Sequence, residues 1–203
     1  MGIPDCQDPP LYRIPDRYTK GVDAHQRLGW LLSIDVSRNK LSWLPGRAFT
    51  HMASLRKLSV AHNILTEIPR EIGELAELQI LSAGHNKLSA LPDEVGLCTK
   101  LAKLEIQQNK ITALPDSVTG LGELAVVKGY SNAIVSLPEQ IGVLSKLAVL
   151  DVSMNRIERL PDTVHGLSSL RTLGLGWNKL EHVSSVQQKH RTPYRHFVMI
   201  GLH

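Results

Sequence analysis

The chain has 203 residues, of which 42% are hydrophobic and 21% are charged. These proportions match soluble globular proteins and exclude both a wholly disordered chain and an ordinary membrane protein. The formal net charge is +4, and the segment from His182 onward holds three basic residues and no acidic one, so the rest of the chain carries only +1. A nearly neutral body gives little support for a surface that follows phosphates, and we expect no nucleic-acid partner.

Residues 1–27 are predicted to form an N-terminal cap or a degenerate first repeat, because the step Ile14–Pro15 anticipates a pattern that recurs further along the chain. No basic region followed by an apolar run occurs here, and no run of eighteen apolar residues occurs in the chain, so we expect neither a secretory signal nor a membrane span. The two cysteines, Cys6 and Cys98, are far apart, which disfavours a disulfide framework or a structural zinc site.

Residues 28–183 are predicted to form seven repeats. Asparagines recur with one step of 24 residues and then five of 23, at Asn39, Asn63, Asn86, Asn109, Asn132, Asn155 and Asn178. Around each lies the pattern seen most clearly in Leu101-x-x-Leu104-x-Ile106-x-x-Asn109-x-Ile111, and a Leu-Pro or Ile-Pro step follows six residues after the first six asparagines. A fixed period of this length is the signature of a solenoid.

Each repeat is predicted to contain one short strand, one turn and one return segment. Alternation at Leu104 and Ile106 indicates a strand with apolar side chains facing inward. The asparagine amide can bond backbone groups of neighbouring coils, so the column of asparagines is expected to form a structural ladder. Proline ends the segment because it lacks the N–H that a sheet needs, and the return leg is expected to be a short helix or turn on the convex side.

This pattern resembles the leucine-rich-repeat superfamily over roughly Leu31 to Leu180, and it is most similar to the 23-residue intracellular Ras-group repeat proteins and their plant relatives. The resemblance implies an α/β solenoid, a curved right-handed coil with a parallel sheet on its concave face. It also implies a scaffold in signalling complexes. Extracellular relatives usually carry cysteine-rich caps, which are absent from this sequence, so we expect a cytoplasmic protein.

Residues 184–203 do not continue the repeat and are predicted to be a basic C-terminal tail or cap. Three charges without a helical face are weak evidence for nucleic acid or an acidic membrane. An open solenoid end exposes apolar core, so the chain is alternatively a piece of a longer protein.

No motif for phosphate binding, zinc proteolysis or a hydrolase nucleophile occurs, and we expect no catalytic residue, cofactor or metal. His62 and His85 should be neighbours on adjacent strands, but Arg38 and Gln108 beside them do not complete a metal shell. Cys98 takes a position held by leucine in other coils and is predicted to be a core residue. The recurring glycines are assigned to the convex turns.

The outward positions of the late coils carry large apolar side chains, which is unexpected on burial grounds in a chain with so few aromatics. They are predicted to bind a protein or peptide partner on the concave face, with charged residues around them. The predicted partner-binding residues are Val126, Lys128, Tyr130, Val149, Asp151, Met154 and Trp177. The alternative for Trp177 is that it packs under the C-terminal tail.

The sequence therefore predicts a non-catalytic protein-interaction scaffold that acts in intracellular signalling. The alternative is the recognition domain of a larger enzyme, such as a kinase or ubiquitin ligase, whose catalytic part lies outside this chain. The pattern gives no indication of oligomeric state.

Overall fold

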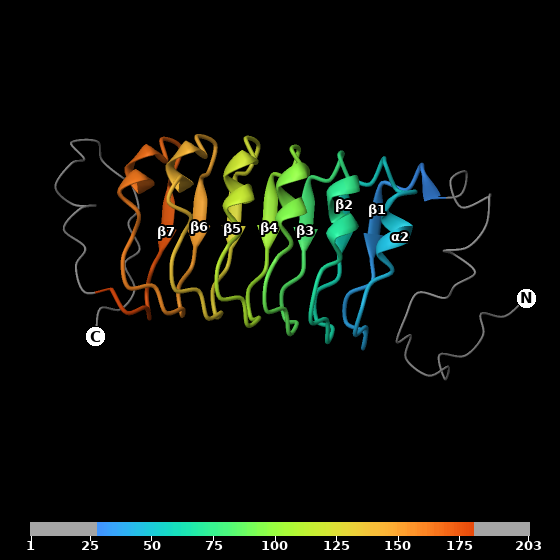
Figure 1. Cartoon of the computed structure of the whole chain (residues 1–203), viewed down its shortest axis with the longest axis horizontal. Helices are drawn as coiled ribbons and strands as arrows, with labels where there is room; N and C mark the ends of the chain where they lie inside the picture. The colour runs from blue at the N-terminus through green and yellow to red at the C-terminus, as the bar shows by residue number, and fades with distance from the viewer. Residues whose placement is uncertain (1–27, 181–203) are drawn as a thin grey trace, which may run out of the picture.

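The computed structural model describes residues 28–180. Seven parallel strands lie side by side in chain order and form one open sheet (Figure 1). They are β1 (Ser33–Asp35), β2 (Lys57–Ser59), β3 (Ile80–Ser82), β4 (Lys103–Glu105), β5 (Val126–Lys128), β6 (Val149–Asp151) and β7 (Thr172–Gly174). The predicted leucine-rich-repeat solenoid is confirmed. The predicted N-terminal segment 1–27, the tail 184–203 and the last three residues of the predicted repeat region lie outside the described residues.

Each strand is three residues long, and only its middle residue faces the core. Leu58, Leu81, Leu104 and Leu150 are buried at this position, whereas the residues on either side of Leu81 and Leu104 are only partly buried. The strands pair without slippage, so that Leu81 lies opposite Leu104 and every column of equivalent residues runs straight across the sheet. A one-residue shift would move the apolar side chains to the other face, which is why the pattern holds the register.

The return segments are one short α-helix and five 3-10 helices. They are α2 (Gly46–Phe49), η2 (Arg70–Glu74), η3 (Asp93–Leu97), η4 (Asp116–Gly120), η5 (Ile141–Val143) and η6 (Asp162–Gly166). Proline directly precedes η2, η3, η4 and η6 with φ between −60° and −70°, the angle to which its ring is restricted. The Leu-Pro step therefore both ends the extended segment and begins the helical turn.

The core is one continuous aliphatic column between the sheet and the return segments. Leu75, Cys98, Leu121 and Leu144 occupy the same position in successive coils and are all buried. The Cys98 thiol donates to the carbonyl oxygen of Ile72 at 3.2 Å. Burial raises the pKa of this thiol to about 11, so the predicted core role of Cys98 is confirmed.

The structure places the ladder asparagines in the turn that follows each strand. Oδ1 of Asn109 accepts a hydrogen bond from the backbone N–H of Leu88 at 2.9 Å, in the preceding coil. Its Nδ2 donates to the carbonyl oxygens of Ala83 in that coil and Ile106 in its own coil. The same bond to the preceding coil is made by Asn63, Asn86, Asn132, Asn155 and Asn178.

The residue before each asparagine has a left-handed backbone conformation, which the sequence did not predict. The values of φ lie between 54° and 60°, although none of the seven residues is glycine. Such angles are uncommon for side chains other than Gly, Asn and Asp, and persist where surrounding bonds impose them. The residues are Arg38, His62, His85, Gln108, Ser131, Met154 and Trp177.

Candidate interaction face

One face of the sheet packs on the core, and the other, here called the open face, carries the outward side chains of the strands and of the turns that follow them. The strand register places Val126 opposite Val149 and Lys128 opposite Asp151. Four of the seven predicted partner-binding residues are therefore direct neighbours on β5 and β6. They form the central part of the predicted site.

Two large apolar side chains, those of Met154 and Trp177, lie in the turns after β6 and β7. Met154 is 53% exposed and Trp177 is 65% exposed. Their coils are joined by hydrogen bonds from the backbone N–H of Met154 to the Gly176 carbonyl oxygen at 2.7 Å and from Asn155 N–H to the Trp177 carbonyl oxygen at 3.1 Å. The two side chains thus project from equivalent positions of adjacent coils.

Tyr130 lies one coil earlier and one residue further from its asparagine. The Ser131 hydroxyl beside it contacts the Met154 sulfur at 3.3 Å, which places Met154 next to the coil of Tyr130. Tyr130 is partly buried. We define the late-coil patch as the five apolar or aromatic members of the predicted site, Val126, Tyr130, Val149, Met154 and Trp177.

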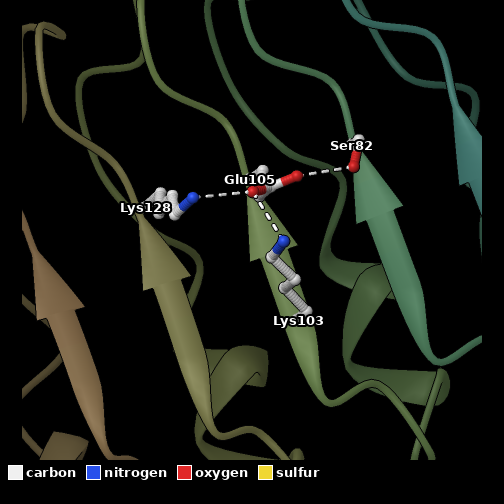
Figure 2. A network of polar contacts seen from close by, with 4 residues as sticks. All are labelled: Ser82, Lys103, Glu105 and Lys128. Carbon is white, nitrogen blue, oxygen red and sulfur yellow. Dashed lines mark hydrogen bonds and ion pairs between the residues drawn. The ribbon is translucent and has the colours of Figure 1, made fainter.

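Lys128, predicted as a charge beside this patch, belongs to an ionic network at the middle of the open face (Figure 2). The Glu105 carboxylate accepts from Lys128 Nζ at 3.0 Å and from Lys103 Nζ at 2.9 Å, and also from the Ser82 hydroxyl at 2.7 Å. Burial of the Glu105 side chain, which is 15% exposed, raises the pKa of its carboxyl. The hydrogen bonds from Lys103, Ser82 and Lys128 outweigh burial and lower this pKa to about 2.

Asp151 is also held in place, by its own turn. Its Oδ1 accepts from the Ser153 backbone N–H at 3.1 Å and from the Ser153 hydroxyl at 2.7 Å. The carboxylate lies over Gly174 of the next strand, where a Cβ atom would collide with Oδ1. Glycine at this position leaves room for the Asp151 side chain.

The early coils present a basic and polar surface instead. The rings of His62 and His85 stack with their centroids 3.9 Å apart and their planes at 16°. Desolvation lowers the pKa of His62, and the neighbouring His85 and Arg38 lower it further. Within residues 28–180, no group of three or more His, Cys, Asp or Glu side chains has an arrangement that would hold a metal ion.

The Glu105 network was not predicted, although its signal was present in the sequence. Ser82, Glu105 and Lys128 are 23 residues apart in succession, which places them in one column across neighbouring strands. Opposite charges that face each other across strands attract. Taking the columns in pairs would have found the contact, but not the burial of the carboxylate.

No helix in the described part of the chain is both long and apolar enough to cross a membrane. A family model described as "Leucine rich repeat" matches residues 30–88 and 130–180, which is more than half of the chain. The chain belongs to the leucine-rich-repeat family. Proteins of this family are typically non-catalytic binding scaffolds, and the fold supports binding of a protein or peptide.

Solved leucine-rich-repeat structures share the fold with this chain. A leucine-rich-repeat protein of Leptospira interrogans is 29% identical with a TM-score of 0.60, over 80% of this chain and 47% of that one. An internalin of Listeria monocytogenes is 23% identical with a TM-score of 0.71, over 82% and 47%. The plant peptide hormone receptor RGFR1, in complex with RGF2, is 29% identical with a TM-score of 0.68, over 83% and 31%. This chain therefore spans less than half the length of each, and no curated protein matches it.

Proposed function

We propose that this leucine-rich-repeat chain is a non-catalytic module that binds a protein or peptide partner on the open face of its sheet, with the late-coil patch as the anchor. The proposal places the protein in cytoplasmic signalling complexes. The 29% identical receptor RGFR1 forms a complex with RGF2, which supports a peptide or protein as the class of partner.

The exposure of Met154 and Trp177 is the observation that carries this proposal. Both side chains are more than half exposed, and both residues have a left-handed backbone. A bulky side chain at such an angle is strained, and an exposed one gains little from burial in the free protein. The left-handed backbone is shared by all seven equivalent turns, so the exposure of large apolar side chains is what distinguishes Met154 and Trp177, and exposed apolar patches are typical of binding sites.

The surroundings of the late-coil patch also support an interface. Interfaces combine large apolar or aromatic anchors with polar groups at the rim. The ion-paired Lys128 and the hydrogen-bonded Asp151 lie between the two ends of the patch and are already fixed in position. A partner therefore meets an ordered surface, which reduces the entropy lost on binding.

The test compares variants of the late-coil patch for binding to a partner recovered with the intact chain. Aromatic anchors often contribute about 2 kcal/mol or more, so Tyr130→Ala or Trp177→Ala should weaken binding at least about thirtyfold. Asp35→Ala, at the far polar end of the open face, is the matched control and should change the dissociation constant less than about threefold. Titration follows circular dichroism that shows unchanged folding.

Normal binding by the late-coil variants, together with failure of Arg38, Lys57 or Lys103 variants, would move the interface to the polar end. Trp177 would then fit the alternative of packing under the C-terminal tail. That alternative also predicts a lower melting temperature for Trp177→Ala, whereas an exposed anchor predicts little change.

The second candidate is the recognition part of a larger enzyme such as a kinase or ubiquitin ligase. It is motivated by the coverage of the solved structures, because the part that aligns with this chain is 31% to 47% of a longer chain in each. Reading the encoding gene on both sides of this sequence distinguishes the two candidates, since a continuous reading frame with a catalytic signature supports the enzyme. Cell fractionation tests the cytoplasmic location.

A further inference from the structure

Every charged residue in the turns around the ladder asparagines is basic. The five-residue segments centred on the seven asparagines hold six Lys or Arg residues and no Asp or Glu. Because the whole chain has a net charge of +4, removing these six leaves −2 for all other residues. The small net charge of the chain therefore conceals an uneven distribution, in which positive charge is concentrated in these turns. We define the basic strip as Arg38, Lys40, Lys87, Lys110, Arg156 and Lys179.

The fold brings the basic strip into one row at the carboxyl ends of the strands. From Asn63 onward, the residue after each asparagine donates its backbone N–H to the preceding coil, as Lys110 does to Leu88 at 2.8 Å and Lys179 to Ile157 at 2.9 Å. These bonds hold successive coils in register, so equivalent side chains are spaced by roughly one strand separation, about 4.8 Å. Strands β1 to β7 follow one another in chain order (Figure 1). Six steps of about 4.8 Å give the row a length of about 30 Å.

Side chains of the basic strip are available to a partner. All six residues are exposed, and none makes an ion pair with another residue between 28 and 180. Other lysines of the same coils behave differently, because Lys103 and Lys128 bind Glu105, and Lys146 binds Glu123. The charges of the strip are therefore not neutralised by ion pairs with other residues between 28 and 180.

The basic strip is continuous with the late-coil patch. Met154 and Arg156 flank the same asparagine, and Trp177 and Lys179 flank the next one. At the other end, the stacked His62 and His85 lie between Arg38 and the middle of the strip, so the row meets no acidic side chain in these turns. Within the five-residue segments its neighbours are cationic, neutral or apolar, and the first acidic residue beyond them in the late coils is the exposed Glu158, two residues after Arg156.

We infer that the basic strip binds an acidic, extended segment of the partner that runs across the coils, and so orients that partner on the open face. This inference rests on the proposed function. A row of about 30 Å accommodates about nine extended residues at 3.3 to 3.6 Å each. Clusters of basic side chains recognise acidic segments by charge complementarity, which sets orientation and association rate.

The shape of the row favours a peptide over a membrane or a nucleic acid. The cations form a narrow row, with Arg38 and Lys40 in the first coil and uncharged Ile64 and Ala133 at the equivalent positions of two other coils. An anionic membrane or a structured nucleic acid is served by a broader basic field. The apolar Met154 and Trp177 lie at only one end of the line. A single extended chain with acidic residues, followed by an apolar anchor, matches both the line and its end.

The experiment titrates the full chain with a fluorescein-labelled peptide of five Glu-Ala repeats, followed by fluorescence anisotropy, with five Gln-Ala repeats as the neutral control. The acidic peptide should bind more tightly than the neutral one, and its binding should weaken as salt rises from about 0.05 to 0.5 M, because salt screens exposed charges. The variant Lys87→Gln/Lys110→Gln/Arg156→Gln should bind the acidic peptide about tenfold more weakly.

The matched control removes the same charge elsewhere. Arg47→Gln/Arg159→Gln/Arg171→Gln also loses three exposed cations, none of them in the basic strip or in an ion pair within residues 28–180, and should bind within about twofold of the parent chain. Equal losses in the two triple variants would overturn the inference, because net charge alone would then explain binding. Binding to phosphatidylserine vesicles or to oligothymidylate, without binding to the acidic peptide, would overturn it as well.

Failure of this inference is distinguishable from failure of the proposed function. A recovered partner that is lost with Trp177→Ala but kept by the strip variant leaves the proposed function standing and removes the strip. A partner that is lost with the strip variant but kept by Trp177→Ala supports the strip and removes the late-coil patch as the anchor.

Discussion

At the scale of single residues, the ladder asparagines link the backbones of neighbouring coils through their side-chain amides. From Asn63 onward, each amide accepts at Oδ1 and donates at Nδ2, as Asn109 does, so one side chain bonds backbone groups of two coils at once. These backbone groups lie where water has little access, and a buried polar group without a partner costs free energy. These hydrogen bonds also hold the residue before each asparagine in its strained left-handed conformation.

Replacement of Asn109 by alanine should lower the free energy of unfolding by about 1 to 3 kcal/mol, because Leu88 N–H and the carbonyl oxygens of Ala83 and Ile106 lose a partner. Urea or thermal denaturation measures the loss. Asn39 is exposed and donates to the carbonyl oxygens of Val36 and Ser37 in its own coil, so Asn39→Ala should cost less. Equal costs for the two variants would contradict the ladder as a link between coils.

The Glu105 carboxylate should make stability depend on pH. Its pKa is lowered from 4.5 to about 2 in the folded chain, so its contribution is fully present above pH 4.5 and is lost as pH falls from 4.5 toward 2. Between about pH 6 and pH 3, the melting temperature of the parent chain should therefore fall more than that of Glu105→Gln.

Ser82→Ala removes one of the three donors to this carboxylate and should give an intermediate pH dependence. Parallel curves of melting temperature against pH for the parent chain and Glu105→Gln would show that the network does not stabilise the ionised form.

At the scale of elements, the return segments pack more closely than side chains allow at some positions. A Cβ atom at Gly142, in η5, would collide with the carbonyl oxygen of Thr163 in η6, and one at Gly166 would approach the Gly142 carbonyl oxygen. Glycine is required here by the approach of two backbones, not by a special φ angle. The 3-10 helices can therefore stack one on the next with the same period as the strands.

Gly142→Ala should destabilise the chain by about 1 to 3 kcal/mol, because the methyl group can be accommodated only by separating η5 from η6. Gly122 is the matched control, since nothing lies within 4 Å of a Cβ atom there, and Gly122→Ala should change stability by less than about 0.5 kcal/mol. Chemical denaturation of both variants gives the comparison. Similar losses would mean that the stacking distance between these helices is not limiting.

At the scale of the whole molecule, stability should vary along the solenoid because each coil contacts only its neighbours. Leu104 in β4 is buried, whereas Ile34 in β1 remains partly exposed. Coils with less buried apolar area open more readily. The late-coil patch and the basic strip are presented on this one-dimensional array, so their spacing depends on the coils between them.

Backbone amide hydrogen exchange should accordingly be slower at Ile106 than at Val36. The two N–H groups occupy equivalent positions and make equivalent hydrogen bonds, at 2.8 Å each, to the next coil. The comparison of protection factors therefore reports the difference in packing between the two coils. Equal protection factors would indicate that the described array unfolds as a single cooperative unit.

The sequence predicted the columns of the open face correctly, because the 23-residue period is also the period of the strand pairing. Val126 lies opposite Val149 for this reason. It did not predict how side chains within the columns interact: Lys128 was expected as a charge beside the patch, and its ion pair with Glu105 was not predicted. The partner of a long side chain depends on its rotamer and on local burial, and the repeat period does not determine either of them.

By itself, the sequence determined the family, the number of coils, the inward and outward positions, and the place of the asparagines. All of these follow from a repeat that buries one aliphatic column in only one register. Only the tertiary structure decided the left-handed backbone before the asparagines, the partial burial of the Glu105 carboxylate, and which lysines form ion pairs and which stay unpaired in the basic strip within residues 28–180. Each of these arises from residues in different coils, and their separation in space is set by the stacking of backbones.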